Sequence, residues 1–166
     1  MPAIAQEMGR TLAVEEPFGW DEIVECIREN TEESLGKLGR SAEGTQNYRV
    51  VRAKLLEEYA TLVDIIKIRT LNFDFVLNED GKKEAVETPP PNPTALVIND
   101  FPYNFKSGIE HFVLWNVRAM SSEEIDKALE LHTKKWEVAW FHNPPSLQSI
   151  PGLWHIHVVS RKKSPS

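Results

Sequence analysis

The spacing of hydrophobic residues changes along this chain, and the change restricts the folds open to it. Between Trp20 and Ile66 the apolar residues recur at helical intervals, whereas from Leu71 onward they alternate as in strands. A chain of 166 residues, 41% of them hydrophobic, is long enough to close one core. We therefore predict an α+β domain, with an N-terminal helical layer followed by an antiparallel sheet with a packed helix.

The helical part is predicted to span residues 18–69. Trp20, Ile23, Val24 and Ile27 form the apolar stripe of a first amphipathic helix. A turn region follows over 36–44, and one longer helix is then expected with its apolar side running from Tyr48 to Ile66. Residues 1–17 lack apolar periodicity and are predicted to be a flexible leader.

The sheet part is predicted to span residues 70–161, and residues 162–166 a solvated tail. Four prolines within 88–93 make a stiff extended connector. Ser121 or Ser122 is expected to cap a helix over 122–132. The expected strands cover residues 71–77, 95–98, 109–116, 136–141 and 153–159.

Composition excludes several classes of protein. The single cysteine, Cys26, rules out a disulfide framework and favours a reducing compartment, so we expect a cytoplasmic protein. No apolar run suggests a membrane span, and the first residues do not read as a secretory signal. The formal net charge of -6 disfavours DNA as a partner.

The most informative segment is the strand that contains His155 and His157. Alternate side chains of a strand share a face, so both imidazoles project to one side, while Trp154, Ile156 and Val158 form an apolar face that packs on the 122–132 helix. Two such imidazoles could bind a metal, or divide labour as nucleophile and proton donor. The alternative is an exposed strand face that tolerates histidine.

Residues 94–161 resemble the histidine-triad superfamily, which includes galactose-1-phosphate uridylyltransferase and has the element order β-β-α-β-β. The resemblance implies that His155 is the nucleophile that forms a nucleotidyl intermediate and that His157 contacts phosphate. The chain departs from the pattern at Leu153, which replaces a histidine, and at Gly152, which lengthens the loop. The matching segments are Asn99-Asp100-Phe101-Pro102, Gly108-Ile109-Glu110-His111 and the stretch from Leu147 through Val159.

The same resemblance assigns the substrate-binding residues. Asn99 or Asp100 falls where a ribose hydroxyl is held, and Gln148 and Ser149 fall in the loop that holds phosphate oxygens. His111 is assigned to the same site, with a buried histidine that fixes its strand as the alternative.

Most of the chain also resembles a fungal family of unknown function typified by N-acetylglucosamine-induced protein 1. That family implies no established reaction. The residues that carry the likeness are Trp20-Asp21, Asn99 to Tyr103, Ile109 to Trp115, Asn143 to Pro151 and Trp154-His155-x-His157-Val158.

The functional expectation is a histidine-dependent nucleotidyl or phosphoryl transferase or hydrolase that acts on a small anionic or nucleotide-type ligand, without metal or cofactor. One alternative is a non-catalytic ligand-binding protein, which Leu153 favours. Another is an arginine-containing cyclodipeptide synthase that uses aminoacyl-tRNA, for which Asp21, Glu22 and Glu25 supply an acidic pattern. Under this reading only, tRNA is a partner. The sequence leaves the oligomeric state open.

Overall fold

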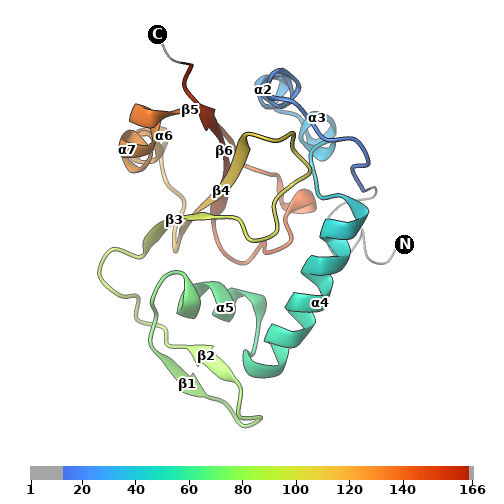
Figure 1. Ribbon diagram of the computed structural model, residues 1–166. Coiled ribbons are helices and arrows are strands. Elements are labelled where there is room, and N and C mark those ends of the chain that lie inside the picture. The colour runs from blue at the N-terminus through green and yellow to red at the C-terminus, as the bar shows by residue number, and fades with distance from the viewer. Residues whose placement is uncertain (1–12, 165–166) are drawn as a thin grey trace.

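A four-stranded antiparallel sheet forms the centre of the structure, a computed structural model that describes residues 13–164 (Figure 1). Its spatial order is β3-β4-β6-β5. The last of these strands in the chain therefore lies inside the sheet, hydrogen-bonded on both sides. The strands are β3 (Thr94–Ile98), β4 (Ile109–Asn116), β5 (Trp136–Phe141) and β6 (His155–Lys162).

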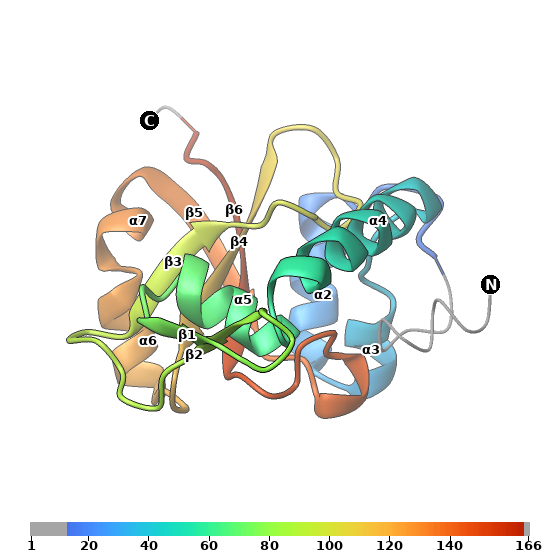
Figure 2. The same cartoon turned by 90° about the horizontal axis from the view of Figure 1, so that it is seen from below.

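Helices cover both faces of this sheet (Figure 2), so the predicted α+β class is confirmed. On one face Ile156 and Val158 of β6 pack on Ile125 and Leu129, as the alternation in β6 predicts. Ile125 lies in α6 (Ser122–Ala128), and Leu129 connects α6 to α7 (Glu130–Lys135). These two short helices replace the single helix expected there.

The other face receives the N-terminal helices. Ile23 of the first helix packs with Phe141 and Val159 of the sheet. Before that helix, Val14 donates its backbone N–H to the Arg40 carbonyl; the rest of the expected leader up to residue 12 lies outside the described residues. The four helices are α2 (Trp20–Glu29), α3 (Glu32–Gly36), α4 (Ala42–Glu58) and α5 (Leu62–Arg69).

The prediction of one long helix through Tyr48 and Ile66 was wrong, because the helix is interrupted between α4 and α5. Tyr59 is extended, at φ -110° and ψ 146°, and the backbone N–H of Ala60 donates to the Lys83 carbonyl at 2.9 Å. The Thr61 side chain then accepts the Asp64 N–H and starts a new helix. Helical periodicity continues across the break and conceals it.

The prediction of a strand over 71–77 was too long. Asn72 has φ 62°, a left-handed conformation that interrupts a strand, so only β1 (Phe75–Leu77) remains. It pairs with β2 (Lys83–Ala85) in a separate hairpin, and this second strand was not among the strands expected. At the C-terminal end, Lys162, expected in the tail, is the final residue of β6.

The register between β4 and β6 places the histidines. Trp115 lies opposite His155, Val113 opposite His157, and His111 opposite Val159, so all of these side chains share one sheet face. A short turn, η1 (Pro145–Leu147), leads from β5 toward β6. The element order from β3 to β6 is strand, strand, helices, strand, strand, while kinship with the histidine-triad superfamily stays a prediction.

Candidate functional site

A cavity of about 140 Å³ lies between the histidine-bearing sheet face and the helices α4 and α5. The sheet contributes His155, His157 and Trp115 to its wall. Because α4 and α5 flank this end of the sheet (Figure 1), the helical layer closes the site instead of merely covering the core. The remaining lining residues are Arg40, Tyr48, Arg52, Leu55, Leu62, Ile65, Ile66, Thr70, Val97, Ile98, Asn99, Asp100, Phe101, Val113, Ser149 and Ile150.

His155 is held in one tautomer. Its Nδ1 lies 2.8 Å from the Leu153 carbonyl oxygen, which can only accept, so Nδ1 carries the proton and Nε2 the lone pair. The side chain of Leu153 is apolar, but its backbone carbonyl supports the second ring nitrogen of His155. The Trp115 ring lies beside the imidazole, tilted by 30°, with ring centroids 4.4 Å apart.

The Nε2 atom of His155 is accessible despite the burial of the residue, which is only 5% exposed. Within residues 13–164 this nitrogen has no hydrogen bond. A fully buried nitrogen without a partner would count as unsatisfied, and among the described residues the only such side-chain atom is Asn143 Oδ1. The Nε2 atom is therefore not fully buried and retains some solvent-accessible surface. Burial lowers the pKa of His155, opposed by its bond to Leu153, so the ring is neutral near pH 7.

A buried chain of hydrogen bonds links the other two strand histidines. The backbone N–H of Tyr103 donates to His111 Nδ1 at 3.0 Å, which leaves His111 Nε2–H to donate to His157 Nδ1 at 2.8 Å. His157 must then carry its proton on Nε2, 3.5 Å from the Tyr103 hydroxyl oxygen. The neutral tautomers of His111 and His157 are thus opposite to that of His155.

This chain ends at Asn143, which is 1% exposed and donates Nδ2–H to the Tyr103 hydroxyl at 3.0 Å. Phe141 stacks on the His157 ring at 5.0 Å with an interplanar angle of 13°, which fixes the ring plane. His157 is therefore held from three sides while it also contributes to the cavity wall.

The other residues expected at the site divide into two groups. Asn99, Asp100 and Ser149 line the cavity with His155 and His157. Of these, Asn99 uses its Oδ1 to accept the Phe101 N–H at 2.8 Å, so it shapes the turn.

His111 and Gln148 do not line the cavity. His111 lies behind His157, and Gln148 donates its Nε2–H to the Asn143 carbonyl at 2.7 Å. His111 thus supports the lining residue His157, whereas Gln148 supports Asn143, which does not itself line the cavity.

Three cavity residues were not expected at the site from the sequence: Arg40, Tyr48 and Arg52. Tyr48 and Arg52 are four residues apart and therefore share a face of α4, a signal that was present in the sequence. Arg40 precedes the helix and gave no periodic signal.

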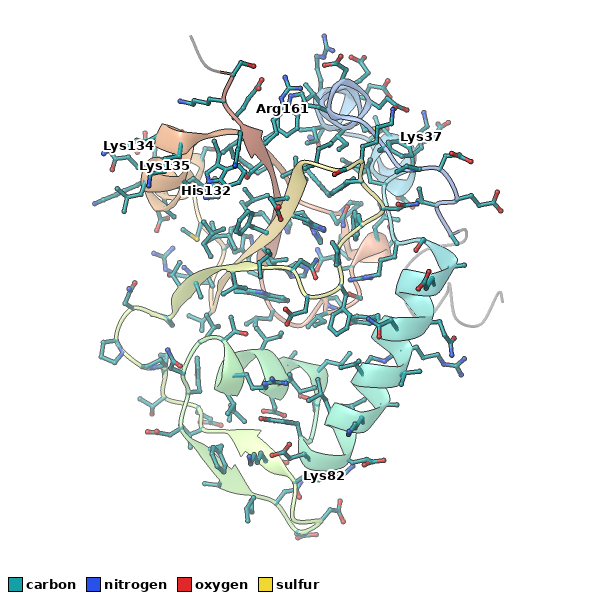
Figure 3. The ribbon with its side chains drawn as sticks, in the orientation of Figure 1. Lys37, Lys82, His132, Lys134, Lys135 and Arg161 are labelled. Atoms are coloured by element: carbon teal, nitrogen blue, oxygen red, sulfur yellow. The ribbon has the colours of Figure 1, made fainter. Side chains whose placement is uncertain are left out.

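The remaining histidines lie elsewhere. His132 Nε2 is 2.7 Å from the buried Ser160 hydroxyl, and Figure 3 places His132 on α7 with Lys134 and Lys135, on the far side of the sheet from α4. His142 contacts the Trp154 ring, on the face opposite the cavity. Burial lowers the pKa of both histidines.

The acidic pattern of α2 makes ordinary contacts at the helix surface. Glu22 accepts the Gly19 N–H at 3.1 Å, and Glu25 pairs with Arg28. Neither Asp21 nor these two glutamates line the cavity. The cyclodipeptide prediction gains no supporting observation from this arrangement and stays a prediction.

Neither a metal-ligand cluster nor a membrane-spanning helix is present within residues 13–164. The described residues contain no group of three or more histidine, cysteine or acidic side chains placed to hold a metal. Among the helices of this same stretch, none has the length and apolar character to cross a membrane.

Comparison with known proteins identifies relatives but no reaction. A family model described as "Protein of unknown function (DUF3605)" matches residues 19–136, a stretch that ends where β5 begins. The chain is 27% identical to Uncharacterized protein YPL067C of Saccharomyces cerevisiae, over 84% of this chain and 77% of that protein. It is 24% identical to N-acetylglucosamine-induced protein 1 of Candida albicans, over 87% and 68% respectively.

One solved structure has the same fold. The crystal structure of HTC1 matches with a TM-score of 0.56 and 23% identity, over 88% of this chain and 86% of that one. The resemblance to the family of N-acetylglucosamine-induced protein 1, expected from the sequence motifs, is confirmed.

Proposed function

The chain belongs to the DUF3605 family of proteins of unknown function, and for this member we propose a histidine-dependent phosphoryl or nucleotidyl transferase or hydrolase. His155 is the proposed nucleophile and the substrate is a small phosphate-bearing molecule. The observation that carries the proposal is the His155 imidazole, whose Nδ1–H is tied to the Leu153 carbonyl while Nε2 remains accessible.

The electronic state of His155 suits attack on phosphorus. Only the neutral imidazole has a lone pair to give, and burial lowers the pKa of His155, so that form predominates at neutral pH. The hydrogen bond from Nδ1 stabilises positive charge that develops on the ring during attack.

The proposed reaction has two steps. The Nε2 lone pair forms a bond to phosphorus while the bond from phosphorus to the leaving oxygen breaks, and this oxygen leaves with the electron pair and takes a proton from water. Water, or another acceptor hydroxyl, then attacks phosphorus. The N–P bond breaks, its electron pair returns to Nε2, and the acceptor's proton passes to solvent.

Neighbouring groups supply charge stabilisation for these steps. His157 lines the same cavity, and its Nε2 atom lies 3.5 Å from the Tyr103 hydroxyl oxygen, which is long for a hydrogen bond. In the proposed scheme the Nε2–H donates instead to a phosphate oxygen of the substrate, at a shorter distance. Ser149 and Asp100 line the same cavity, and we assign to them the binding of the remainder of the substrate. Gln148 acts in this scheme through the Asn143 carbonyl.

A second candidate is a non-catalytic binding protein with the same cavity. The predominance of apolar side chains in the wall favours it, because such a wall binds ligand without contributing to chemistry. In either case we propose a cytoplasmic location, since Cys26 is an unpaired thiol.

Turnover assays separate these two functions. The wild type, His155→Ala and His142→Ala are incubated with a dinucleoside polyphosphate, a nucleoside diphosphate sugar and phenyl phosphate. We expect turnover that falls at least a hundredfold in His155→Ala only, with an acid-labile phosphorus adduct on the peptide that contains residue 155. Equal turnover by His155→Ala overturns the mechanism, and binding of the probes without turnover favours the second candidate.

A further inference from the structure

The deep end of the cavity is apolar. Three side chains of its wall, Trp115, Val113 and Ile65, are at most 7% exposed. Ile98 lines the same cavity but is 55% exposed, so the cavity opens toward solvent on that side. A group that enters past Ile98 therefore reaches a wall built mainly of hydrocarbon. The other aliphatic lining residues are Leu55, Leu62, Ile66, Val97 and Ile150.

His155 lies at this apolar end. Its ring centroid is 4.4 Å from that of Trp115, and its Nδ1 atom is 2.8 Å from the carbonyl oxygen of Leu153. Trp115 and Leu153 are both members of one hydrophobic cluster, which also contains Val113 and Ile150. The imidazole is therefore in direct contact with the apolar wall.

The Nε2 atom of His155 is a hydrogen-bond acceptor within this apolar surface. The residue lines the cavity and is 5% exposed, and no residue within 13–164 forms a hydrogen bond with this nitrogen. Because Nδ1–H donates to the Leu153 carbonyl, Nε2 carries the lone pair and can only accept. A ligand group that donates a hydrogen bond here removes the cost of leaving a largely buried polar atom unsatisfied.

A neutral hydroxyl group is the donor that suits this position. Beside aliphatic side chains, burying a hydroxyl group that has a hydrogen-bond partner costs far less than burying a charge. A phenolic hydroxyl has a pKa of about 10 and therefore keeps its proton at neutral pH. Burial lowers the pKa of His155, so the imidazole stays neutral and keeps its lone pair under the same conditions.

The size of the cavity limits the rest of the ligand. Its volume of about 140 Å³ is close to that of an apolar cavity of about 150 Å³ that accommodates one benzene. Pockets that enclose larger ligands span roughly 300–1,000 Å³. The space suits one six-membered ring and is too small to enclose two fused rings.

We infer that the cavity binds a compact neutral molecule of the phenol class. Its ring lies among the aliphatic side chains beside Trp115, and its hydroxyl group donates to His155 Nε2. This inference goes beyond the proposed function, because it concerns what the cavity holds whether or not His155 attacks phosphorus.

Calorimetry on the wild-type protein compares phenol with three probes that each change one feature. Benzene lacks the hydroxyl group, methanol lacks the ring, and naphthol has a second fused ring. We expect phenol to bind at least fivefold more tightly than each of them, because only phenol fills the apolar space and also satisfies Nε2. Benzene or naphthol binding as tightly as phenol overturns the inference.

One pair of variants tests the acceptor. His155→Phe removes Nε2 and keeps a ring of similar size in the wall. We expect this variant to lose the preference for phenol over benzene, because a buried hydroxyl group then has no partner. His142→Phe, the same change beside Trp154 and away from the cavity, is expected to keep the preference. An equal effect of the two variants overturns the inference.

A second pair tests the apolar space. Ile66→Phe places additional bulk in the wall and is expected to weaken phenol and benzene alike, at least tenfold. Val50→Phe adds a ring to the exposed surface of α4, where Val50 is 57% exposed, and is expected to change neither. Unchanged binding in Ile66→Phe contradicts the assigned position of the ring. Thermal unfolding verifies that each variant is folded, and the wild-type comparison decides the inference even where a variant is not.

The outcomes distinguish this inference from the proposed function. If phenol binds with the expected dependence on His155 but the wild type forms no phosphorus adduct and no product, the ligand class stands and the catalytic function fails. If the phosphate probes are turned over in a His155-dependent manner but phenol does not bind, the catalytic function stands and this inference fails.

Discussion

Removal of one hydroxyl group, in Tyr103→Phe, tests the buried polar chain on which the site is built. The Tyr103 hydroxyl accepts the Asn143 Nδ2–H at 3.0 Å, and the other amide atom, Asn143 Oδ1, is already buried without a partner. The variant therefore leaves the whole side-chain amide of Asn143 without a hydrogen bond inside the core.

The magnitude follows from the cost of an unsatisfied buried donor, about 1–3 kcal/mol. The contact to His157 adds little, because at 3.5 Å it is at the limit of a hydrogen bond. For a domain of this size, 1 kcal/mol shifts Tm by about 2–4 °C. Tyr103→Phe is thus expected to lower Tm by roughly 2–12 °C.

Thermal unfolding followed by circular dichroism measures the change, with Tyr59→Phe as the matched control. Tyr59 is similarly buried, but its hydroxyl has no hydrogen bond to any residue that the structure describes. We expect this control to stay within about 0.5 kcal/mol of wild type. If Tyr103→Phe is equally silent, the chain through Asn143 and His157 contributes nothing to stability and the reasoning is refuted.

Three further predictions concern the same region. Long-range ¹H–¹⁵N spectra are expected to report the Nδ1–H tautomer for His155 and the Nε2–H tautomer for His111 and His157; the same tautomer for all three contradicts the assigned hydrogen bonds. Gly152→Ala is expected to lower the free energy of unfolding by about 1–3 kcal/mol, measured in urea, because an added Cβ would meet Val63 Cγ2 at 2.9 Å; an unchanged midpoint argues against this packing. Burial lowers the folded-state pKa of His155, so the unfolded chain takes up the proton first and stability falls as pH drops below about 6.5; His155→Gln is expected to flatten this fall, and equal pH slopes contradict it.

The strands of the central sheet were the most predictable part of the fold. The alternation in 109–116 and 136–141 identifies β4 and β5 with the bounds found in the structure. Strand alternation also places His155 and His157 on one face, because the period of two leaves no other arrangement. The α+β class follows from these segments together with the helical stripe of α2.

The parts that the sequence did not predict depend on long-range contacts. The break after α4 depends on the pairing of Ala60 with Lys83, which no local pattern encodes. The inclusion of Arg40 in the cavity depends on its bond to the Phe101 carbonyl, 61 residues away. The support of His155 by the backbone of Leu153 is invisible to side-chain motifs, because every residue type has that carbonyl.

The position of β6 between β4 and β5 has a consequence for how the protein matures. Synthesis delivers both neighbouring strands before β6 exists, and until then each has an open edge on the side where β6 will pair. His155 and His157 arrive on the strand that closes this gap. The nascent chain therefore acquires both imidazoles in the same event that pairs these two inner edges, and a translation product that stops before β6 lacks the imidazoles and keeps both edges open.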